Sequence, residues 1–399
     1  MASAADAPSR TRIVRPHLRI LGIRGIPARH GGFETFTEKL APYLVRQGWK
    51  VTVYCQDPGS GPIYEDLWSG VRRVHIPSGK DTPWSTIAFD LRANLHARRE
   101  EGITLTLGYN TAVFIALLRR KGIRNVINMD GIEYARAKWG PLARLWLRLN
   151  ERAAIKFADH LIADHPEIKE HLSPRAKGHD ISVISYGSDR VTAQSAKGLQ
   201  DLGLEPGKYL SVIARPEPEN SLLEIVRAFS AKRRGVSLAV LGNYCSDIPY
   251  HRAVKSAASE EVLFFGAVYD RVLVSTIRSH SLAYIHGHQV GGSNPSLIEA
   301  LGAGNPIIAH DNRFNRWVAG PGARFFRGLE DLESHLSAVL ENEETRKSMH
   351  DSSLRRHAEA FTWDRILTDY SSLLAQEEKL AYQFDIFPAA VEDRQASTF

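Results

Sequence analysis

The sequence predicts an α/β protein with two Rossmann-like domains. Short apolar runs alternate with helix-like segments from residue 17 onward, which is typical of parallel strands joined by crossover helices. The series is interrupted once, over residues 191–206, by Ser, Gly, Gln, Lys and Pro, and then starts again. A chain of 399 residues that is 43% hydrophobic has enough apolar content for two cores.

The elements follow from these patterns in order. Apolar runs predict strands in the first half at 18–23, 51–55, 103–107, 126–130 and 160–163, with a helix at 33–46 whose Phe33, Phe36, Leu40 and Leu44 share one face. The second half predicts a helix at 222–229 and strands at 209–214, 237–242, 262–265, 282–285 and 306–309. We expect a disordered basic arm (1–16), a first Rossmann-like domain (17–190), a linker (191–206), a second Rossmann-like domain (207–362), a C-terminal helix packing back across the cleft that the domains face (363–383) and a flexible tail (384–399).

A glycine-bearing segment over residues 286–300 is the strongest indication of a binding site. Asn294 suits a helix N-cap, and Pro295 suits the first helical position. The unpaired N–H groups of a first helical turn, together with the helix dipole, attract anions. Glu299, one turn further on, can accept hydrogen bonds from sugar hydroxyls. The segment therefore predicts a nucleotide-diphosphate pocket; the alternative is an ordinary strand–loop–helix turn with a solvated Glu.

A second glycine loop, residues 24–34, separates the first strand from the first helix. Gly31 and Gly32 allow backbone N–H groups to approach a ligand where that helix begins. The loop lacks the G-x-G-x-x-G pattern of dinucleotide-binding proteins, which weighs against an NAD site.

Composition narrows the function further. Cys55 and Cys245 form neither a disulfide framework nor a metal cluster, and the chain has no apolar run near the ~20 residues of a membrane span. The absence of an Asp-x-Asp pair argues against a metal-held diphosphate, and His286, His288 and His310 lack the spacing and partners of a zinc site. Residues 1–190 carry a net charge of +10 and the rest −4, which suggests that the first half faces an anionic partner.

The segment 141–157 predicts a basic amphipathic helix. Leu142, Leu145, Trp146, Leu149 and Ala153 form its apolar stripe, and Arg144, Arg148, Arg152 and Lys156 recur along one flank. Such a helix can lie on an anionic bilayer. The alternative, which we favour for the apolar face, is a helix docked on its sheet with a solvated basic edge.

These motifs resemble those of retaining glycosyltransferases of family 4, which have the GT-B fold. The order of the glycine loop, the linker, Arg215-Pro-Glu-Pro-Glu-Asn220 and a helix ending in Glu-Ala carries the likeness. More narrowly, residues 24–34 and 286–296 resemble a bacterial branch containing rhamnosyltransferases of capsule and exopolysaccharide assembly. The resemblance runs from about residue 17 to 370 and includes Asp130-Gly-Ile-Glu133, Lys138-Trp-Gly140 and His310-Asp-Asn312.

The resemblance implies roles for individual residues. Arg215 grips the donor diphosphate, while Asn220 stands where the family has a Lys. Glu299 matches the second of two family glutamates and Gly291 replaces the first. That loss suits a donor with fewer hydroxyls, such as a 6-deoxyhexose; alternatively, Gly291 lets the backbone approach the sugar. The implied donor contacts are Gly31, Gly32, Arg215, Asn220, Gly291, Gly292, Ser293, Asn294, Ser296 and Glu299.

The resemblance implies front-face substitution with retention and without a covalent intermediate. Arg215 and the N–H groups around Asn294 to Ser296 stabilise the leaving diphosphate, with Glu299 completing the donor site. Asp130, at a strand's carboxyl end, either orients and partly deprotonates the acceptor hydroxyl or caps the following turn. The expected catalytic residues are thus Asp130, Arg215 and Glu299, with no metal and no cofactor.

The resemblance thus implies a hexosyltransferase peripheral to the inner face of the plasma membrane, with the first domain binding the acceptor. It transfers L-rhamnose from dTDP-rhamnose to a polyprenyl-diphosphate-linked saccharide during surface polysaccharide synthesis, and nucleic acid is not a partner. The alternatives are a hexosyltransferase using a UDP- or GDP-sugar, a sugar-nucleotide epimerase on the same fold, and a non-catalytic binding protein.

Overall fold

The computed structural model describes residues 15–29, 31–80, 82–136, 138–192 and 195–386. They form two compact units. The first holds the described residues of Met1–Thr106, Ala116–Val126 and Leu374–Phe399, and the second holds those of Leu107–Ile115 and Ile127–Leu373. Most of the expected basic arm, and the expected tail beyond residue 386, lie outside the described residues.

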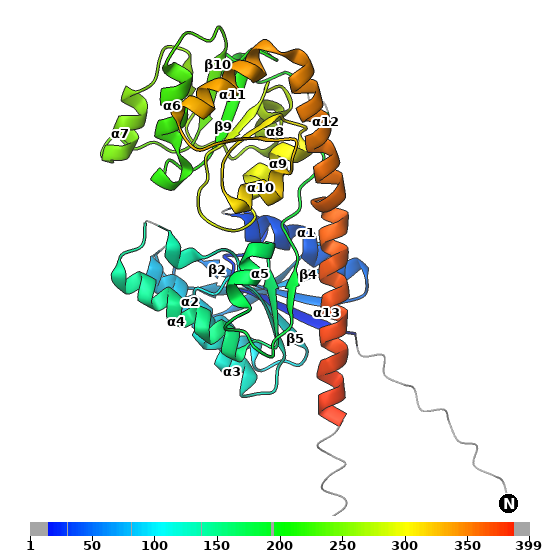
Figure 1. Ribbon diagram of the computed structural model, residues 1–399. Coiled ribbons are helices and arrows are strands. Elements are labelled where there is room, and N and C mark those ends of the chain that lie inside the picture. The colour runs from blue at the N-terminus through cyan, green and yellow to red at the C-terminus, as the bar shows by residue number, and fades with distance from the viewer. Residues whose placement is uncertain (1–14, 30, 81, 137, 193–194, 387–399) are drawn as a thin grey trace, which may run out of the picture. The chain divides into compact units, whose positions relative to one another are not determined.

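The first sheet has eight strands in the order β3-β4-β2-β1-β5-β6-β7-β8. Figure 1 labels β2, β4 and β5 among them. Its strands are β1 (His17–Leu21), β2 (Lys50–Asp57), β3 (Tyr64–Trp68), β4 (Val71–Pro77), β5 (Ile103–Leu107), β6 (Asn125–Asn128), β7 (His160–Ala163) and β8 (Ile181–Val183). The antiparallel strand β3 forms one edge, whereas β4, β2, β1 and β5 run parallel. The accompanying helices are α1 (Gly32–Arg46), α2 (Pro83–Ala97), α3 (Ile115–Arg119), α4 (Pro141–Phe157) and α5 (Pro166–Leu172).

The second sheet has six parallel strands in the order β11-β10-β9-β12-β13-β14. They are β9 (Tyr209–Ile213), β10 (Ser237–Leu241), β11 (Val262–Phe264), β12 (Tyr284–His286), β13 (Ile307–His310) and β14 (Arg324–Phe326). The helices of this half are α6 (Leu222–Ser230), α7 (Pro249–Ser256), α8 (Arg271–Ser279), α9 (Pro295–Gly302), α10 (Arg313–Ala319), α11 (Leu329–Glu341), α12 (Glu343–Ala360) and α13 (Trp363–Ile386). The predicted fold class, α/β with two Rossmann-like sheets, is confirmed.

In each sheet, the order in which successive strands are added reverses at one point. In the first sheet the strand order reverses between β1 and β5, and in the second between β9 and β12. Ligands of open α/β sheets bind at the carboxyl ends of the strands at such switch points. The loop after β1 is the predicted glycine loop 24–34, and the loops after β9 and β12 carry the other predicted donor residues.

Most predicted elements are present, with shifted ends. Strands β5 and β7 match their predicted ranges residue for residue, and Phe36, Leu40 and Leu44 of α1 are fully or almost fully buried. Strand β6 ends at Asn128 instead of residue 130, because the Asn128 side chain accepts the Asp130 N–H (2.8 Å) and Asp130 adopts a positive φ of 53°. The backbone therefore turns before it reaches Asp130.

The predicted linker is partly packed. Leu199 and Leu204 are buried and join Tyr209 and Ile277 in one apolar cluster of the second sheet. A short 3-10 helix, Gln200–Leu202, lies between the two leucines. Among the described helices, none is both long and apolar enough to cross a bilayer.

Candidate functional site

Two loops lie together at the switch point of the second sheet. Strands β9 and β12 are neighbours there, with Tyr284 in register with Ser211. The chain leaves β9 toward Arg215 and leaves β12 toward the glycine turn at Gly291 and Gly292. The fold thus brings together two predicted segments that are far apart in the sequence.

Hydrogen bonds hold these two loops together. The Asn220 Oδ1 lies 2.7 Å from Nδ1 of His288, and the Ser221 hydroxyl donates to the Gly287 carbonyl at 2.8 Å. The Gln289 amide donates to the Ser221 hydroxyl at 2.8 Å. Gly287 must be glycine for this contact, since a Cβ there would lie 2.0 Å from the Asn220 carbonyl oxygen. The two loops therefore form one rigid edge.

Arg215 has the free cationic group of this edge. Its side chain is exposed, and its guanidinium has no hydrogen-bond or ion-pair partner within the described part of the chain. Burial first, and then the positive charges of Arg136 and Arg215, lower the pKa of His288 to about 4. His288 is therefore neutral at neutral pH, and the cationic character of the edge comes from arginine.

Asn220 occupies a different position from the one expected. Its amide donates to the Arg215 carbonyl at 2.8 Å and pairs through its oxygen with His288, and the residue is 7% exposed. Both ends of the amide are thus used within the protein. Asn220 therefore supports the Arg215 loop, and its burial leaves its amide little access to a ligand.

The start of α9 confirms the predicted cap and limits the predicted anion site. Asn294 is the N-cap, accepting the Ser296 N–H at 3.0 Å, and Pro295 is the first helical residue. The Ser296 hydroxyl lies 2.8 Å from the Tyr284 hydroxyl. The Ser293 N–H donates to Asp164 at 2.6 Å. Two of the backbone N–H groups expected to face a phosphate are therefore already hydrogen-bonded within the protein.

Glu299 is held by a buried arginine. Its Oε2 lies 2.7 Å from Arg278 Nη2; the Arg278 side chain is 6% exposed and that of Glu299 is 36% exposed. The same guanidinium donates to the Ser296 hydroxyl at 3.1 Å. Glu299 is therefore fixed in orientation on α9 and still reaches solvent, as a hydrogen-bond acceptor for a ligand must.

Asp130 lies on the loop after β6, within the same compact unit as Arg215 and Glu299. It remains solvent-exposed, yet the surrounding protein removes enough water to raise its pKa, and the charge of Glu133 adds to this effect. Its carboxyl also receives a backbone hydrogen bond from Gly131. A carboxylate with a raised pKa is a better proton acceptor, and the Gly131 contact fits the alternative capping role equally well.

An ionic network joins the Asp130 loop to the Arg215 loop. Arg136 donates to Glu219 at 2.8 Å and lies 3.2 Å from Glu133, which also pairs with Lys138 at 2.9 Å. Burial opposes ionisation of Glu133, but Arg136 and Lys138 outweigh it and lower the Glu133 pKa. These cations are neutralised by carboxylates, unlike Arg215.

Sequence reasoning missed three residues that organise the site: Asp164, Arg278 and Arg136. Asp164 follows β7, so the rule that ligands gather at carboxyl ends of strands provides a signal for it. Arg278 and Arg136 gave no such signal, because their partners Glu299 and Glu219 are distant in the sequence.

The predicted glycine loop of the first sheet lies in the first compact unit. Gly31 is the N-cap of α1 and Gly32 its first residue, one position earlier than predicted. A Cβ on Gly31 would lie 2.9 Å from the Glu34 carboxylate, whose Oε1 accepts the Arg24 N–H at 3.1 Å. The described residues of this loop therefore lie close to the start of α1.

His286, His288 and His310 lie at or just after the ends of β12 and β13. Among the described residues, no three His, Cys, Asp or Glu side chains are grouped as metal binding requires. Burial lowers the pKa of His286 strongly and that of His310 more moderately. His286 is 4% exposed and its Nε2 has no partner in the described structure.

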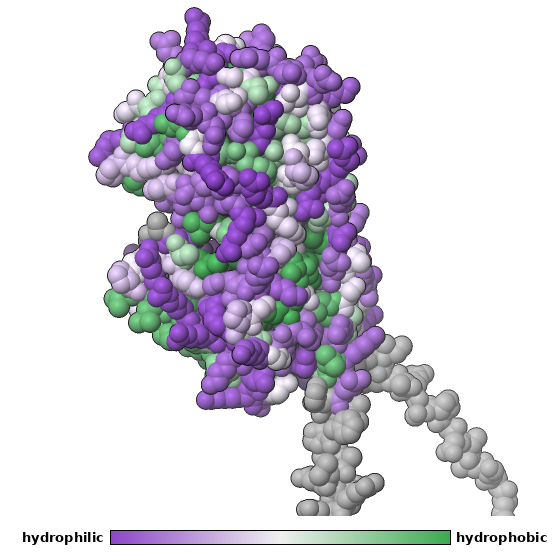
Figure 2. Space-filling model, viewed as in Figure 1, coloured by the Kyte–Doolittle hydropathy of each residue, from purple (hydrophilic) through white to green (hydrophobic). Residues whose placement is uncertain are grey.

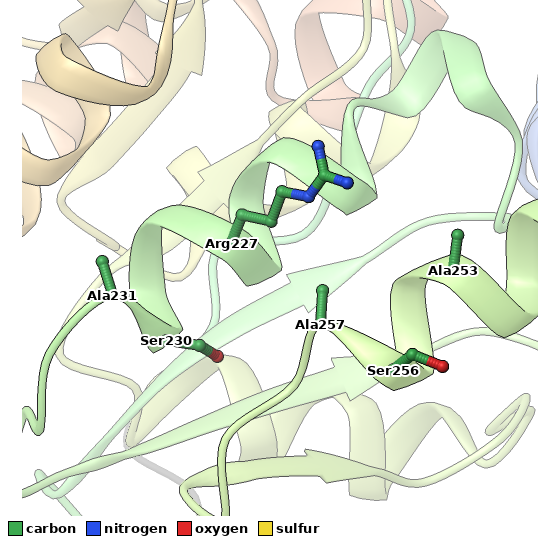
Figure 3. A pocket seen from close by; sticks show the side chains of 6 residues that line it. All are labelled: Arg227, Ser230, Ala231, Ala253, Ser256 and Ala257. Carbon is green, nitrogen blue, oxygen red and sulfur yellow. The ribbon is translucent and has the colours of Figure 1, made fainter.

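An open depression between α6 and α7 lies elsewhere (Figure 3). It is lined by Arg227, Ser230, Ala231, Ala253, Ser256 and Ala257. These residues lie toward the carboxyl ends of two crossover helices, and such ends return to the amino edge of a parallel sheet. The depression is thus at the edge opposite to Arg215, and only Arg227 carries charge among its lining residues.

We compared the chain with known protein families and solved structures. Residues 15–189 match a family model described as a domain of unknown function (DUF1972), and no curated protein matches the chain. Sucrose-phosphate synthase from Thermosynechococcus elongatus is similar in structure, with a TM-score of 0.77 and 16% identity over 91% of this chain and 99% of that one.

Two further solved structures show the same likeness. HepE from Anabaena, in complex with UDP and glucose, has a TM-score of 0.72 and 13% identity over 91% of this chain and 100% of that one. A UDP-forming trehalose-phosphate synthase from Burkholderia xenovorans has a TM-score of 0.69 and 12% identity over 90% of this chain and 100% of that one. The chain therefore has the GT-B fold that its motifs predicted.

Proposed function

We propose that the chain is a glycosyltransferase that takes a sugar from a nucleotide-diphosphate donor. The observation that carries this proposal is the exposed, unpaired guanidinium of Arg215, which follows β9 at the switch point and is linked through Asn220 to the loop that leads into the glycine turn. Diphosphate is the ligand that a free guanidinium fork at a strand end fits best. Neighbours of the same fold include HepE, solved with UDP and with UDP-glucose.

The proposed reaction breaks the bond between the anomeric carbon and the diphosphate oxygen with retention. Arg215 stabilises the charge that develops on that oxygen, and Glu299 accepts a hydrogen bond from a hydroxyl of the donor's pentose. Asp130 orients the acceptor hydroxyl and accepts its proton. The sequence has no Asp-x-Asp pair to hold a metal on the diphosphate, so we propose that the protein's own cations suffice.

The donor we propose is dTDP-rhamnose. Gly291 stands where the resembling family has an acid, and a 6-deoxyhexose offers one hydroxyl fewer to hold. The second candidate, a UDP-hexose donor, is favoured by the UDP and UDP-glucose complexes of HepE.

The acceptor we propose is a polyprenyl-diphosphate-linked saccharide at the inner face of the plasma membrane. The surface of α4 supports this proposal.

Our favoured expectation, that the apolar face of α4 docks on its sheet, is wrong. Leu142, Leu145, Trp146 and Leu149 are 85%, 55%, 37% and 47% exposed, and only Ala153 of the predicted stripe is buried. Figure 2 shows the apolar side chains gathered where α4 runs in Figure 1. Arg148, Arg152 and Lys156 are exposed on the same helix, which suits an anionic membrane surface.

A donor screen by thermal shift tests the proposal. We expect dTDP-rhamnose, or else a UDP- or GDP-sugar, to raise the melting temperature, since a ligand that binds only the folded state stabilises it. Arg215→Ala should weaken donor binding about tenfold or more, because it removes a charged hydrogen-bond donor. Arg227→Ala, which removes an exposed arginine at the opposite edge, is the matched control. No shift with any nucleotide sugar, or equal losses in both variants, would overturn the assignment.

A further inference from the structure

Asp164 holds the glycine turn from the end of β7. Its Oδ2 accepts the Ser293 N–H at 2.6 Å, and its backbone carbonyl accepts the Ser293 hydroxyl at 2.6 Å. The Ser185 hydroxyl donates to Ser293 Oγ at 2.8 Å. Ser293 is therefore fixed by three hydrogen bonds, all inside one compact unit.

Missing side chains allow this close approach. A Cβ on Gly292 would lie 3.0 Å from Asp164 Oδ2, and the positive φ of 105° at Gly292 favours glycine there as well. A Cβ on Gly131 would lie 2.5 Å from the Gly291 carbonyl oxygen. The backbone at Gly131, next to Asp130, thus packs directly on the turn, and a side chain at either position would separate them.

The carboxyl of Asp164 is enclosed. The residue is 8% exposed, and its Oδ1 is buried without a hydrogen-bond partner in the described structure. Asn128, at the end of β6, accepts the Asp130 N–H and donates to the Tyr370 hydroxyl at 2.7 Å. The charge of Asp130 acts on Asp164, and that of Asp164 acts on Tyr370. Burying a carboxyl that exchanges its hydration for a single N–H donor costs folding free energy. Such a cost is tolerated where the buried group fixes the geometry of its neighbours.

We propose that Asp164 is a positioning residue for the sugar transfer: it fixes the Gly291–Ser293 turn beside Asp130, so that ordered backbone faces the donor sugar at the position where an acidic side chain is missing. This inference rests on the proposed function. It explains why residues 131 and 292 are both glycine, since a side chain on Gly292 would push the turn away from Asp164 and one on Gly131 would push it away from the Asp130 loop.

Three variants test the proposal: Asp164→Ala, Asp164→Asn and Ser185→Ala, with the exposed Asp201→Ala as control. Transfer is measured as kcat and donor KM, and hydrogen exchange follows the 287–296 segment. Asp164→Ala should lower kcat about tenfold or more with donor KM changed less than about threefold, because a displaced turn impairs reaction more than binding. In this variant the backbone N–H groups of the 287–296 segment should also exchange faster. Asp164→Asn should recover most of the lost kcat, since its amide oxygen can accept the same N–H.

The remaining outcomes are decisive as well. Ser185→Ala removes only one hydroxyl and serves as the second variant in case Asp164→Ala does not fold. It should lower kcat about threefold with the donor KM unchanged. An Asn variant as slow as the Ala variant would show that negative charge is needed and overturn positioning, and so would unaltered kcat in Asp164→Ala or in Ser185→Ala. If the wild-type chain transfers no sugar, the proposed function fails, and hydrogen exchange of the 287–296 segment still tests whether Asp164 holds the turn. Faster exchange in Asp164→Ala than in both the wild type and Asp164→Asn supports this role, and equal exchange in all three would overturn it.

Discussion

Arg215 differs from the other predicted donor residues in having a side chain with no partner in the described structure. Asn220, Ser293 and Ser296 are each hydrogen-bonded within the protein, and Glu299 shares one oxygen with Arg278. A free cation among committed neighbours is ready to bind an anion without first breaking internal contacts. We therefore expect donor binding to depend more on Arg215 than on these neighbours.

Glu299 pairs with the buried Arg278, and we propose that it also faces the donor; two substitutions separate these roles. Glu299→Ala leaves the buried Arg278 without its carboxylate, so we expect a loss of about 1–3 kcal/mol in the free energy of unfolding and weaker donor binding. Glu299→Gln keeps an acceptor for Arg278 and should cost less stability, yet it should still raise the donor Kd about threefold or more. Urea unfolding and donor titration measure the two effects. A Gln variant with the wild-type donor Kd would contradict the ligand-facing role.

Asp164 makes the stability of the fold depend on pH. Burial, and then the charge of Asp130, raise the pKa of Asp164 from its ordinary value of 3.8 to about 7. Its contribution to stability is therefore complete below pH 3.8 and is lost as pH rises through about 7. Compared with wild type, Asp164→Asn should become progressively more stable between those pH values, by about 1.4 kcal/mol for each pH unit.

Urea unfolding of both proteins at a series of pH values measures this difference. Asp201→Asn, in an exposed 3-10 helix, is the matched control and should show none. Stability curves that stay parallel for wild type and Asp164→Asn would show that Asp164 titrates as an ordinary surface acid.

At the scale of elements, strands with continuous apolar sequences could be predicted, whereas contacts between distant parts of the chain could not. Strands β5 and β7 match their predicted ranges because they are fully buried runs. The hairpin of β3 and β4 was not predicted, since β3 is a polar edge strand with the sequence Tyr-Glu-Asp-Leu-Trp. The cap at Asn294 was predictable because its partner Ser296 is local.

The site shows the same division between local and distant contacts. Local motifs led us to propose Arg215, Glu299 and the glycine turn as site residues, whereas Asp164 and Arg278 contact residues far along the chain. The free face of α4 was misassigned because hydrophobic periodicity marks an apolar stripe without showing what covers it. On the opposite side of that helix, Leu147, Ala154 and Ile155 are buried.

Helix α4 should bind anionic membranes through its exposed face. Leu145→Glu combined with Leu149→Glu should abolish sedimentation with phosphatidylcholine–phosphatidylglycerol vesicles, since each leucine side chain removed from water contributes about 1.5–3 kcal/mol. Raised salt should weaken wild-type binding, because Arg148, Arg152 and Lys156 act electrostatically. Leu67→Glu on β3, where Leu67 is 76% exposed, is the control and should bind as wild type does. Equal sedimentation of all variants, or none of the wild type, would contradict this assignment.

At the scale of the whole molecule, the two sheets place their switch-point loops at strand carboxyl ends, as ligand-binding α/β folds do. The same fold in sucrose-phosphate synthase, HepE and trehalose-phosphate synthase extends over at least 90% of this chain. With identities of 12–16%, the comparison fixes the fold, and the chemistry has to be argued from Arg215, Glu299 and Asp130.

Acceptor-dependent release of nucleoside diphosphate tests the central claim most directly. The purified chain is incubated with dTDP-rhamnose, or with the nucleotide sugar that gives the largest thermal shift, with and without a polyprenyl-diphosphate-linked saccharide. Our account predicts that nucleoside diphosphate and elongated lipid-linked product appear in equal amounts only when the acceptor is present, and that Arg215→Ala slows both about tenfold or more. Conversion of the nucleotide sugar to an epimer without acceptor, or no turnover of any donor with acceptor, would contradict it.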